Sequence, residues 1–373
     1  MKKKILFLIN SLAGGGAEKA MIDLLQHLDY ARYEVSLCLV FRTGCYIQDV
    51  PPQVRLFHLY EQERNFPHRK SMKIYRRQGC RLLLRLCARW KIRGHYDAII
   101  SFLEGDALLF HDMVRDRAER NIAWVHCDLP AFHWTRRAFR TDDDERTAYS
   151  HMDRIVFCSR LTMESFERFY DVPVPKCCIY NVIDLEQIRR AAGDAAPAHA
   201  IPVVTAVGSL SEVKCHDRLI RVARMCKDAG REVRFRIVGT GALEEPLKQL
   251  CRELDVTEMV EFLGFRKPPY PFMKSSDVFI STSRSEAASL VLCEAMAVGT
   301  PIVATRTMAA EEFLEESRYG IVTGDSDEEI CEGLRRMLDD PQLRRHYREQ
   351  GLQRAEQFSS VRTMQQFDEL VSG

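Results

Sequence analysis

The feature that most constrains this chain is a series of short, continuously apolar segments separated by amphipathic helical stretches. The apolar segments span residues 4–9, 33–40, 98–102, 122–125, 155–158, 203–207, 234–238, 260–263, 278–280 and 301–304, and residues 17–28 have the spacing of a helix. Strands that are apolar on both faces and alternate with helices indicate parallel sheets covered on both sides. We therefore predict an α/β fold built from doubly wound, Rossmann-like sheets.

The composition of the chain changes near residue 190. Residues 190–202 are rich in alanine and proline, which is typical of an interdomain connection. We expect an N-terminal domain at 1–188, a linker at 189–202, a second Rossmann-like domain at 203–355, and a C-terminal helix at 356–373 that returns to the first domain. Ligands of such sheets bind at the carboxyl ends of the strands, so we expect a site in a cleft between the domains.

The overall composition excludes several classes of protein. Hydrophobic residues make up 46% and charged residues 29%, and the net charge of +1 gives no general attraction to nucleic acid. The thirteen cysteines lack the spacing of metal or redox motifs, which favours buried thiols in a reducing compartment. No apolar run approaches the roughly 20 residues that span a bilayer, and the apolar part of the N-terminus is too short for a signal peptide. We expect a cytoplasmic protein without a nucleic-acid partner.

Two glycine-rich loops follow predicted strands. The dinucleotide-binding fingerprint requires a third glycine, but that position is Lys19 after Gly14-Gly-Gly16 and Glu244 after Gly239-Thr-Gly241. A nicotinamide or flavin cofactor is therefore not expected. Backbone N–H groups at Gly15 and Gly16 could still bind an anion at a helix start, or the loop could be a simple helix entry. The residues alone leave both interpretations open.

Two glutamates mark the most apolar helix of the second half. Glu294 lies inside the otherwise apolar run Leu290-Val-Leu-Cys-Glu-Ala-Met-Ala-Val298, and Glu286 lies eight positions earlier. A buried carboxylate without a partner is costly, so Glu294 needs a donor. A ribose diol could supply two hydrogen bonds while the N–H groups of Ser289 and Leu290 hold a phosphate. The alternative is an intramolecular salt bridge, and the spacing does not separate the two.

These motifs together resemble the retaining GT-B glycosyltransferases of group 1, or family 4. The resemblance covers almost the whole chain, because the motifs occur in the same order as in the family. They are Gly14-Gly-Gly-Ala-Glu18, Trp124-Val-His-Cys-Asp128, Ile179-Tyr-Asn-Val-Ile-Asp184, Val207-Gly-Ser-Leu-Ser-Glu-Val-Lys214, Val238-Gly-Thr-Gly241, Phe262-Leu-Gly-Phe265, and the pair Glu286 and Glu294 followed by Gly299-Thr-Pro301.

The resemblance implies transfer of a sugar from a nucleotide diphosphate sugar, UDP- or GDP-linked, with retention of anomeric configuration. That donor is a substrate, so no cofactor and no metal are expected. The leaving diphosphate would act as the base for the incoming hydroxyl, so the protein positions groups and stabilises charge. The implied catalytic residues are His126 beside the transferred sugar, Glu286 on sugar hydroxyls and Lys214 on the diphosphate. The implied donor-binding residues are Gly15, Gly16, Ser209, Lys214, Gly239, Phe265, Arg266, Ala288, Ser289, Leu290 and Glu294.

The chain departs from the family at several of these positions. Ser209 stands where the family usually has arginine, Cys215 where it has glycine, and Ala287-Ala-Ser289 replaces a glycine-containing stretch. Loss of the arginine removes a charge that would face phosphate. Arg266 or Lys267 could compensate for it, or donor affinity is weaker.

Other polar clusters have simpler explanations. Asp142-Asp-Asp144 could pass for a metal-binding motif, but its charged surroundings favour a solvated helix start. His126 alone would be interpreted as a structural histidine, and only the resemblance favours a functional role. His111 and His133 lack such a context.

A basic segment at residues 69–93 is the remaining unusual feature. Basic residues recur every four positions and no acidic residue interrupts them: Lys73, Arg77, Arg81, Arg85 and Arg89. A helix there could lie on an anionic membrane, or pack its leucines inward and expose a basic face. We expect a peripheral enzyme that extends a lipid-linked glycan in surface polysaccharide synthesis. The alternatives are a nucleotide-sugar isomerase of the same fold and a non-catalytic partner subunit.

Overall fold

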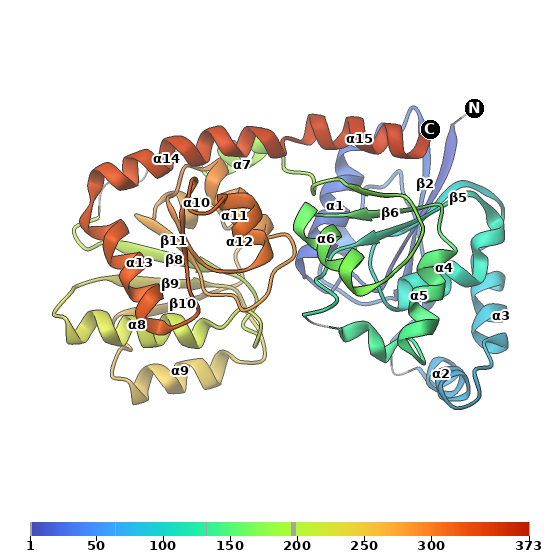
Figure 1. Cartoon of the computed structure of the whole chain (residues 1–373), viewed down its shortest axis with the longest axis horizontal. Coiled ribbons are helices and arrows are strands. Elements are labelled where there is room, and N and C mark those ends of the chain that lie inside the picture. The colour runs from blue at the N-terminus through green and yellow to red at the C-terminus, as the bar shows by residue number, and fades with distance from the viewer. Residues whose placement is uncertain (1, 64, 132, 195–198, 373) are drawn as a thin grey trace. The chain divides into compact units, whose positions relative to one another are not determined.

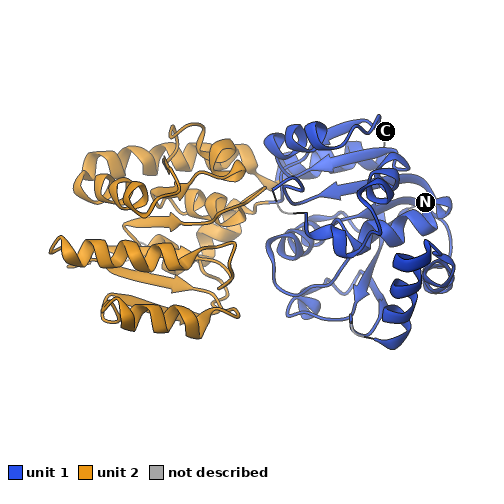
Figure 2. Cartoon of the chain, turned by 60° about the horizontal axis from the view of Figure 1, so that its bottom comes forward, with its two compact units in different colours: residues 1–182, 361–373 blue, residues 183–360 orange. Residues whose placement is uncertain are grey.

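The computed structural model describes residues 2–63, 65–131, 133–194 and 199–372, which form two compact units (Figure 2). Unit 1 comprises Met1–Val182 and Val361–Gly373, and unit 2 comprises Ile183–Ser360. Residues 195–198 of the expected linker lie outside the described residues. The unit boundary at 182/183 precedes the helix α7 (Leu185–Ala191), which extends into the first residues of that linker.

Unit 1 contains a seven-stranded parallel sheet with strand order β3-β2-β1-β4-β5-β6-β7. Its strands are β1 (Lys3–Ile9), β2 (Tyr33–Phe41), β3 (Arg55–Tyr60), β4 (Tyr96–Ser101), β5 (Ala118–Val125), β6 (Arg154–Phe157) and β7 (Lys176–Cys178). Its helices are α1 (Gly16–His27), α2 (Phe66–Gln78), α3 (Leu82–Lys91), α4 (Asp106–Val114), α5 (Asp142–Ser150), α6 (Arg160–Phe169) and α15 (Ser360–Ser372).

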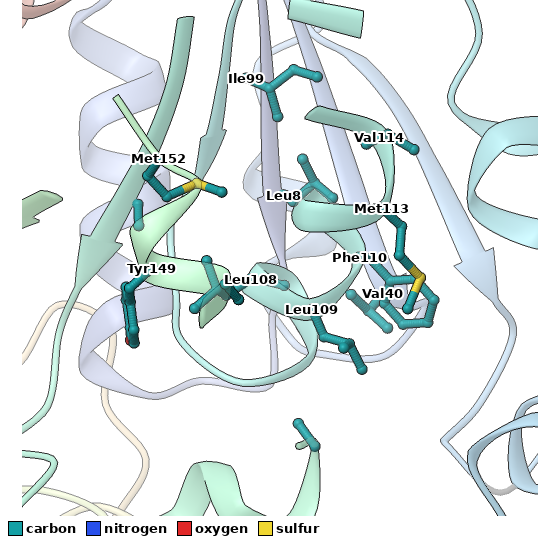
Figure 3. Close-up of a cluster of buried hydrophobic side chains, with 14 of the residues drawn as sticks. Leu8, Val40, Ile99, Leu108, Leu109, Phe110, Met113, Val114, Tyr149 and Met152 are labelled. Atoms are coloured by element: carbon teal, nitrogen blue, oxygen red, sulfur yellow. The ribbon is translucent and has the colours of Figure 1, made fainter. Parts of the chain in front are cut away.

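Successive side chains of β1 point to opposite faces of this sheet, and helices cover both faces. Leu8 points toward a buried cluster with α4 side chains such as Leu108 and Phe110 (Figure 3). The preceding residue, Phe7, points the opposite way, and its ring stacks on Phe367 of α15 with the centroids 6.0 Å apart. The C-terminal helix therefore completes the core of unit 1, on the face opposite α4.

Unit 2 contains a six-stranded parallel sheet with strand order β10-β9-β8-β11-β12-β13. Its strands are β8 (Val203–Val207), β9 (Arg234–Val238), β10 (Val260–Gly264), β11 (Val278–Ser281), β12 (Ile302–Thr305) and β13 (Ile321–Thr323). Its helices are α7 (Leu185–Ala191), α8 (His216–Asp228), α9 (Glu244–Glu253), α10 (Tyr270–Lys274), α11 (Leu290–Ala297), α12 (Met308–Leu314), α13 (Asp327–Asp339) and α14 (Pro341–Ala355). Figure 1 shows α8, α9 and α13 on one side of the sheet, and α7, α10, α11 and α14 on the other.

Both sheets are doubly wound, as predicted, and each reverses its strand order at one point. The reversal lies between β1 and β4 in unit 1 and between β8 and β11 in unit 2. In doubly wound sheets the loops after such strands diverge to opposite faces, and ligands bind there at the carboxyl edge. All the predicted strand segments are strands. The sequence missed β3, β7 and β13, which lie at or beside the sheet edges, where burial is incomplete and the apolar signal is weak.

The basic segment is not one helix, and the prediction of a continuous stripe is wrong. Gly79 adopts φ +71° and ends α2, so the spacing of four residues is interrupted before α3 begins at Leu82. Arg81 pairs with Asp112 at 3.0 Å, and Arg89 pairs with Asp116 at 2.7 Å. Two members of the stripe therefore contact acidic residues of unit 1.

The leucines of α3 do not all pack inward. Leu84 is buried, but the exposed fractions are 59% for Leu82, 56% for Leu86 and 63% for Trp90. The interpretation that these side chains fill the interior is wrong for them. Among the residues that the structure describes, no helix is both long enough and apolar enough to cross a membrane.

Candidate functional site

An ion pair spans the reversal point of the second sheet. Lys214 follows β8, Glu286 follows β11, and Lys214 Nζ lies 2.6 Å from Glu286 Oε1. Ser283 Oγ donates to the same oxygen at 2.7 Å. Within the described part of the chain, Glu286 Oε2 accepts no hydrogen bond. The arrangement holds a cation and a carboxylate oxygen at the edge where ligands of doubly wound sheets bind.

Backbone contacts hold the two loops of this ion pair together. Thr282 Oγ1 donates to the carbonyl oxygens of Lys214 and Cys215, each at 3.0 Å, and Arg284 N donates to Val213 O at 2.8 Å. Cys215 itself has φ +48°, a left-handed conformation that glycine adopts without strain. The glycine that the resemblance led us to expect at this position would therefore have a conformational reason.

Glu294 is buried, as its apolar surroundings predicted, with only 2% of its surface exposed. It lies in α11, and Tyr270 OH of the short helix α10 donates to its Oε1 at a long 3.4 Å. The buried Tyr270 supplies a neutral donor. Whether a ribose diol binds Glu294 remains a prediction, and so does its alternative, an internal salt bridge.

The N-terminus of α11 has an unusual cap. Ser289 occupies the capping position, but its side chain makes no capping hydrogen bond. Its Oγ is buried and has no hydrogen-bond partner among the described residues. The first N–H groups of a helix together with an unpaired hydroxyl form a set of donors that suits an anion. The predicted residues Ala288 and Leu290 flank this serine.

Gly239 is required by the packing of backbone against backbone. A Cβ atom on Gly239 would stand 1.9 Å from Gly208 O, and one on Gly241 would stand 2.3 Å from Leu210 O. The loops after β8 and β9 therefore touch directly, next to Lys214. This contact accounts for both glycines without a ligand, and the donor-binding role of Gly239 stays a prediction.

The other predicted donor residues of unit 2 are exposed. Ser209 Oγ lies 3.0 Å from Ser211 Oγ. Because a serine side chain is uncharged, this position supplies no cation. Phe265 is 53% exposed after β10. The guanidinium of Arg266 lies 5.9 Å from the centre of the Phe272 ring. Compensation for the missing arginine by Arg266 stays a prediction.

The glycine loop of unit 1 is partly filled by a side chain. Gly15 is the N-cap of α1 and Gly16 is its first residue. A Cβ atom on Gly15 would stand 2.4 Å from Glu18 Oε2, so the carboxylate folds back over the loop. Burial raises the pKa of Glu18, and hydrogen bonds from the backbone of Glu18 and Gly15 oppose that shift. This contact supports the helix-entry interpretation, although the glycines remain exposed.

His126 follows β5 and is enclosed by aromatic rings. The Phe102 ring centroid lies 4.5 Å from that of the imidazole, and Trp124 stacks on it at 6.1 Å. Burial lowers the pKa of His126 to about 3, so the imidazole is neutral at pH 7. Its Nε2 is buried and has no partner among the described residues. A neutral imidazole can donate one hydrogen bond to a ligand and accept another, but it offers no positive charge to a phosphate.

Sequence reasoning missed three residues that hold the predicted ones. Ser283 bonds to Glu286, Tyr270 bonds to Glu294, and Glu104 accepts the backbone N–H groups of His126 and Cys127, each at 2.6 Å. Of these three residues, only Glu104 could have been noticed in the sequence, because it is a charged residue between an apolar strand and Gly105. The other two depend on tertiary contacts.

The remaining polar candidates have structural roles. Asp142–Asp144 form the first turn of α5, as the helix-start interpretation predicted, with Thr141 as the N-cap. His133 Nε2 lies 2.8 Å from the buried Glu145, and His111 contacts Ser101 and Asn121. Over the described ranges, no group of three His, Cys, Asp or Glu side chains is arranged to hold a metal ion.

Comparison with known proteins agrees with this architecture. Residues 14–187 match the family Glycosyltransferase Family 4, and residues 194–354 match Glycosyl transferases group 1. An N-acetylgalactosamine-N,N'-diacetylbacillosaminyl-diphospho-undecaprenol 4-alpha-N-acetylgalactosaminyltransferase of Campylobacter jejuni is 27% identical over 374 residues, covering 96% of this chain and 97% of that protein. A D-inositol 3-phosphate glycosyltransferase of Corynebacterium urealyticum is 30% identical over 67% of this chain and 66% of its own length.

Solved structures share the fold at low sequence identity. Anabaena Alr3699/HepE in complex with UDP and glucose superposes with a TM-score of 0.76 at 22% identity and covers 100% of both chains. WaaG, a glycosyltransferase involved in lipopolysaccharide biosynthesis, gives a TM-score of 0.72 at 16% identity over 99% of this chain and 100% of its own.

The two matched families and the two doubly wound units define a glycosyltransferase of the GT-B fold. The chain belongs to the group 1, or family 4, glycosyltransferases, which confirms the resemblance seen in the sequence. It therefore transfers a sugar from a nucleotide-sugar donor to a glycan acceptor.

Proposed function

We propose that this enzyme uses a UDP-sugar and extends a lipid-linked glycan in surface polysaccharide synthesis. The name of the Campylobacter jejuni relative describes a diphospho-undecaprenol-linked acceptor, and that relative aligns over nearly the whole chain. The HepE structure of the same fold holds UDP and glucose. Neither protein fixes the sugar that this chain transfers.

The observation that carries the proposed donor site is the ion pair between Lys214 and Glu286 at the reversal point of the second sheet. A lysine ammonium has three donors, so Lys214 can keep Glu286 and still donate to a diphosphate oxygen. Glu286 keeps Oε2 for hydroxyl groups of the sugar. In this proposal the sugar therefore lies beside the diphosphate from which it is transferred.

The helix α11 supplies the remaining donor contacts in this proposal. Glu294 binds the ribose hydroxyls, and Tyr270 orients its carboxylate from the adjacent helix. The N–H groups at the start of α11 and the unpaired Ser289 Oγ receive phosphate oxygens. Phe265 offers an exposed aromatic face for the base.

The reaction needs little covalent participation by the protein. In front-face transfer, the bond between the anomeric carbon and the diphosphate breaks, and the diphosphate oxygen takes the proton of the attacking hydroxyl. Lys214 and the α11 N-terminus stabilise the charge that develops on that diphosphate. His126, neutral at pH 7, holds a hydroxyl of the transferred sugar.

Association with an anionic membrane is the second part of the proposal. The side chains of Leu82, Leu86 and Trp90 are exposed on α3, although such groups usually avoid water. Lys73, Arg77 and Arg85 on α2 and α3 are exposed basic residues of the same segment. Exposed apolar groups beside basic ones are typical of helices that lie in the headgroup region. A lipid-linked acceptor would be located at such a surface.

The direct test of the donor site is a thermal-shift screen with UDP-, GDP- and ADP-sugars. A ligand that binds the folded state at 100 times its Kd adds about 2.7 kcal/mol of stability. We expect a UDP-sugar to raise the melting temperature, and Glu294→Gln to abolish that rise. Donor consumption that increases with a lipid-linked acceptor identifies a transferase, whereas conversion without acceptor identifies an isomerase. No shift with any nucleotide sugar would contradict the proposal.

A further inference from the structure

A buried carboxylate lies where two central strands of unit 1 end. Glu104 follows β4 and is only 1% exposed. Its Oε1 accepts the backbone N–H groups of His126 and Cys127, each at 2.6 Å, and its Oε2 has no partner among the described residues. Burial of a carboxylate is unfavourable, and two short bonds to one oxygen offset part of that cost. No sequence motif of this chain assigned a role to Glu104.

Glu104 acts on the main chain that carries His126. The strands β4 and β5 are neighbours, and the bonds from Glu104 fix the peptide groups at the point where β5 ends. The rings of Phe102 and Trp124 fix the faces of the imidazole. The aromatic rings therefore set the tilt of His126, and Glu104 sets the position of its backbone.

The same segment also reaches the first strand. Ala107 N donates to Asn10 Oδ1 at 2.8 Å, across the reversal point between β1 and β4. Gly105 has φ +72°, and a Cβ atom there would stand 2.9 Å from the Trp134 ring. Residues 104–107 thus connect the ends of β1, β4 and β5 in a packed arrangement.

We propose that Glu104 is a positioning residue of the transfer reaction, which acts by holding the backbone of His126 at the carboxyl edge of unit 1. This inference rests on the proposed function, in which His126 lies beside the transferred sugar. Glu104 itself touches no substrate.

The hydrogen-bond geometry separates this role from others. Both N–H groups bind the same oxygen, so the carbonyl oxygen of glutamine can replace it in Glu104→Gln. Glu104→Asp keeps the charge but is one methylene shorter and cannot reach both groups. Glu104→Ala loses both bonds. A positioning role therefore predicts that glutamine preserves activity better than aspartate, the reverse of what a role for the negative charge predicts.

The experiment measures kcat, the KM for donor and the melting temperature of these variants, of His126→Ala, and of the double variant Glu104→Ala/His126→Ala. We expect Glu104→Ala and Glu104→Asp to lower kcat at least tenfold with the donor KM unchanged, and Glu104→Gln to stay within about threefold of the native enzyme. The double variant should be no slower than His126→Ala, because Glu104 acts through His126.

A second buried carboxylate provides a matched control. Glu145 is fully buried in unit 1 and binds the side chains of His133, Thr135 and Tyr170 rather than the backbone of His126. Glu145→Gln should lower the melting temperature. In a double variant with His126→Ala, the two fold-losses in kcat should multiply, because Glu145 does not act through His126.

Several results would overturn the inference. They are native kcat in both Glu104→Ala and Glu104→Asp, activity of Glu104→Asp at or above that of Glu104→Gln, or multiplied losses in the double variant. If His126→Ala alone has native kcat, the proposed role of His126 fails instead, which distinguishes that failure from one of Glu104. If Glu104→Ala does not fold, the order of glutamine and aspartate still decides.

Discussion

Lys214 and Glu286 are 72 residues apart in the chain, yet their side chains meet at 2.6 Å across the reversal point of the second sheet. The side chains are 23% and 9% exposed, so the contact is partly shielded from water. Fold topology brings them together, because the loops after β8 and β11 are adjacent only in this strand order. A cation that already has a carboxylate partner is positioned before the donor arrives.

The first prediction concerns this cation. Lys214→Ala should lower kcat/KM by at least roughly 30-fold, about 2 kcal/mol of transition-state stabilisation, because Ser209 provides no second charge. Steady-state kinetics with the donor identified by thermal shift measures the effect. Ser209→Arg in that background should recover part of the loss. Unchanged kcat/KM would place the diphosphate elsewhere.

The second prediction separates the two carboxylates. Glu294→Gln should weaken donor binding at least tenfold, because charge-assisted bonds to the ribose become neutral ones. Glu286→Ala should mainly lower kcat. Tyr270→Phe is the matched control, since it removes one donor to Glu294 and leaves the carboxylate in place. If Glu294→Gln unfolds the protein while its folded fraction binds donor normally, Glu294 belongs to an internal salt bridge.

The third prediction follows from the backbone of Cys215. Its φ of +48° strains any residue with a Cβ atom by about 1–2 kcal/mol, whereas glycine is unstrained. Cys215→Gly should therefore be more stable than Cys215→Ala by about 0.5–1 kcal/mol, after the greater entropy of unfolded glycine is subtracted. Alanine is the proper reference because both variants lose the sulfur atom. Calorimetry that finds alanine the more stable of the two would refute this explanation.

The fourth prediction is a pH dependence of stability. Burial lowers the pKa of His111 from 6.5 to about 4, so the unfolded state binds a proton that the folded state does not. The contribution of neutral His111 to the free energy of unfolding is complete above pH 6.5. It falls as the pH drops toward 4, by about 1.4 kcal/mol per pH unit. His111→Gln should therefore flatten the decline between pH 6 and 4.5. All three tryptophans, Trp90, Trp124 and Trp134, lie in unit 1, so their fluorescence in urea follows the relevant unit. Equal slopes in both proteins would disprove the assignment.

The fifth prediction concerns membrane binding. Each basic side chain near an anionic surface contributes on the order of 1 kcal/mol, and the attraction should fade with salt. Replacing Lys73, Arg77 and Arg85 by glutamine should abolish sedimentation with anionic liposomes and leave donor binding unchanged. Leu86→Ser/Trp90→Ser should weaken sedimentation at all salt concentrations, because it removes apolar insertion. Arg81 is excluded from the set, since its ion pairs with Asp112 and Asp144 stabilise the fold.

The control for membrane binding is the replacement of exposed basic residues of unit 2. Arg252 and Arg345 are exposed on α9 and α14, and their change to glutamine should not alter sedimentation. Native protein that ignores anionic liposomes at low salt would show that α2 and α3 present only a solvated face.

The sequence by itself determined the elements of this protein that depend on local pattern. Continuous apolar segments specify strands buried on both faces, and their alternation with helices specifies parallel sheets. The burial of Glu294 followed from its apolar neighbours in one helix. The helix α11 also begins at Leu290, where the apolar run begins.

Only the tertiary structure decided which side chains meet and which remain exposed. Glu286 and Lys214, Glu294 and Tyr270, and Glu104 and the backbone of His126 are pairs from distant segments, and no local spacing encodes such contacts. Likewise, the leucines of α3 have the composition of a buried face, but the unit covers Leu84 and leaves Leu82 and Leu86 in solvent. Periodicity fixes the face of a helix on which a side chain lies, whereas the packing of the whole chain fixes what that face touches.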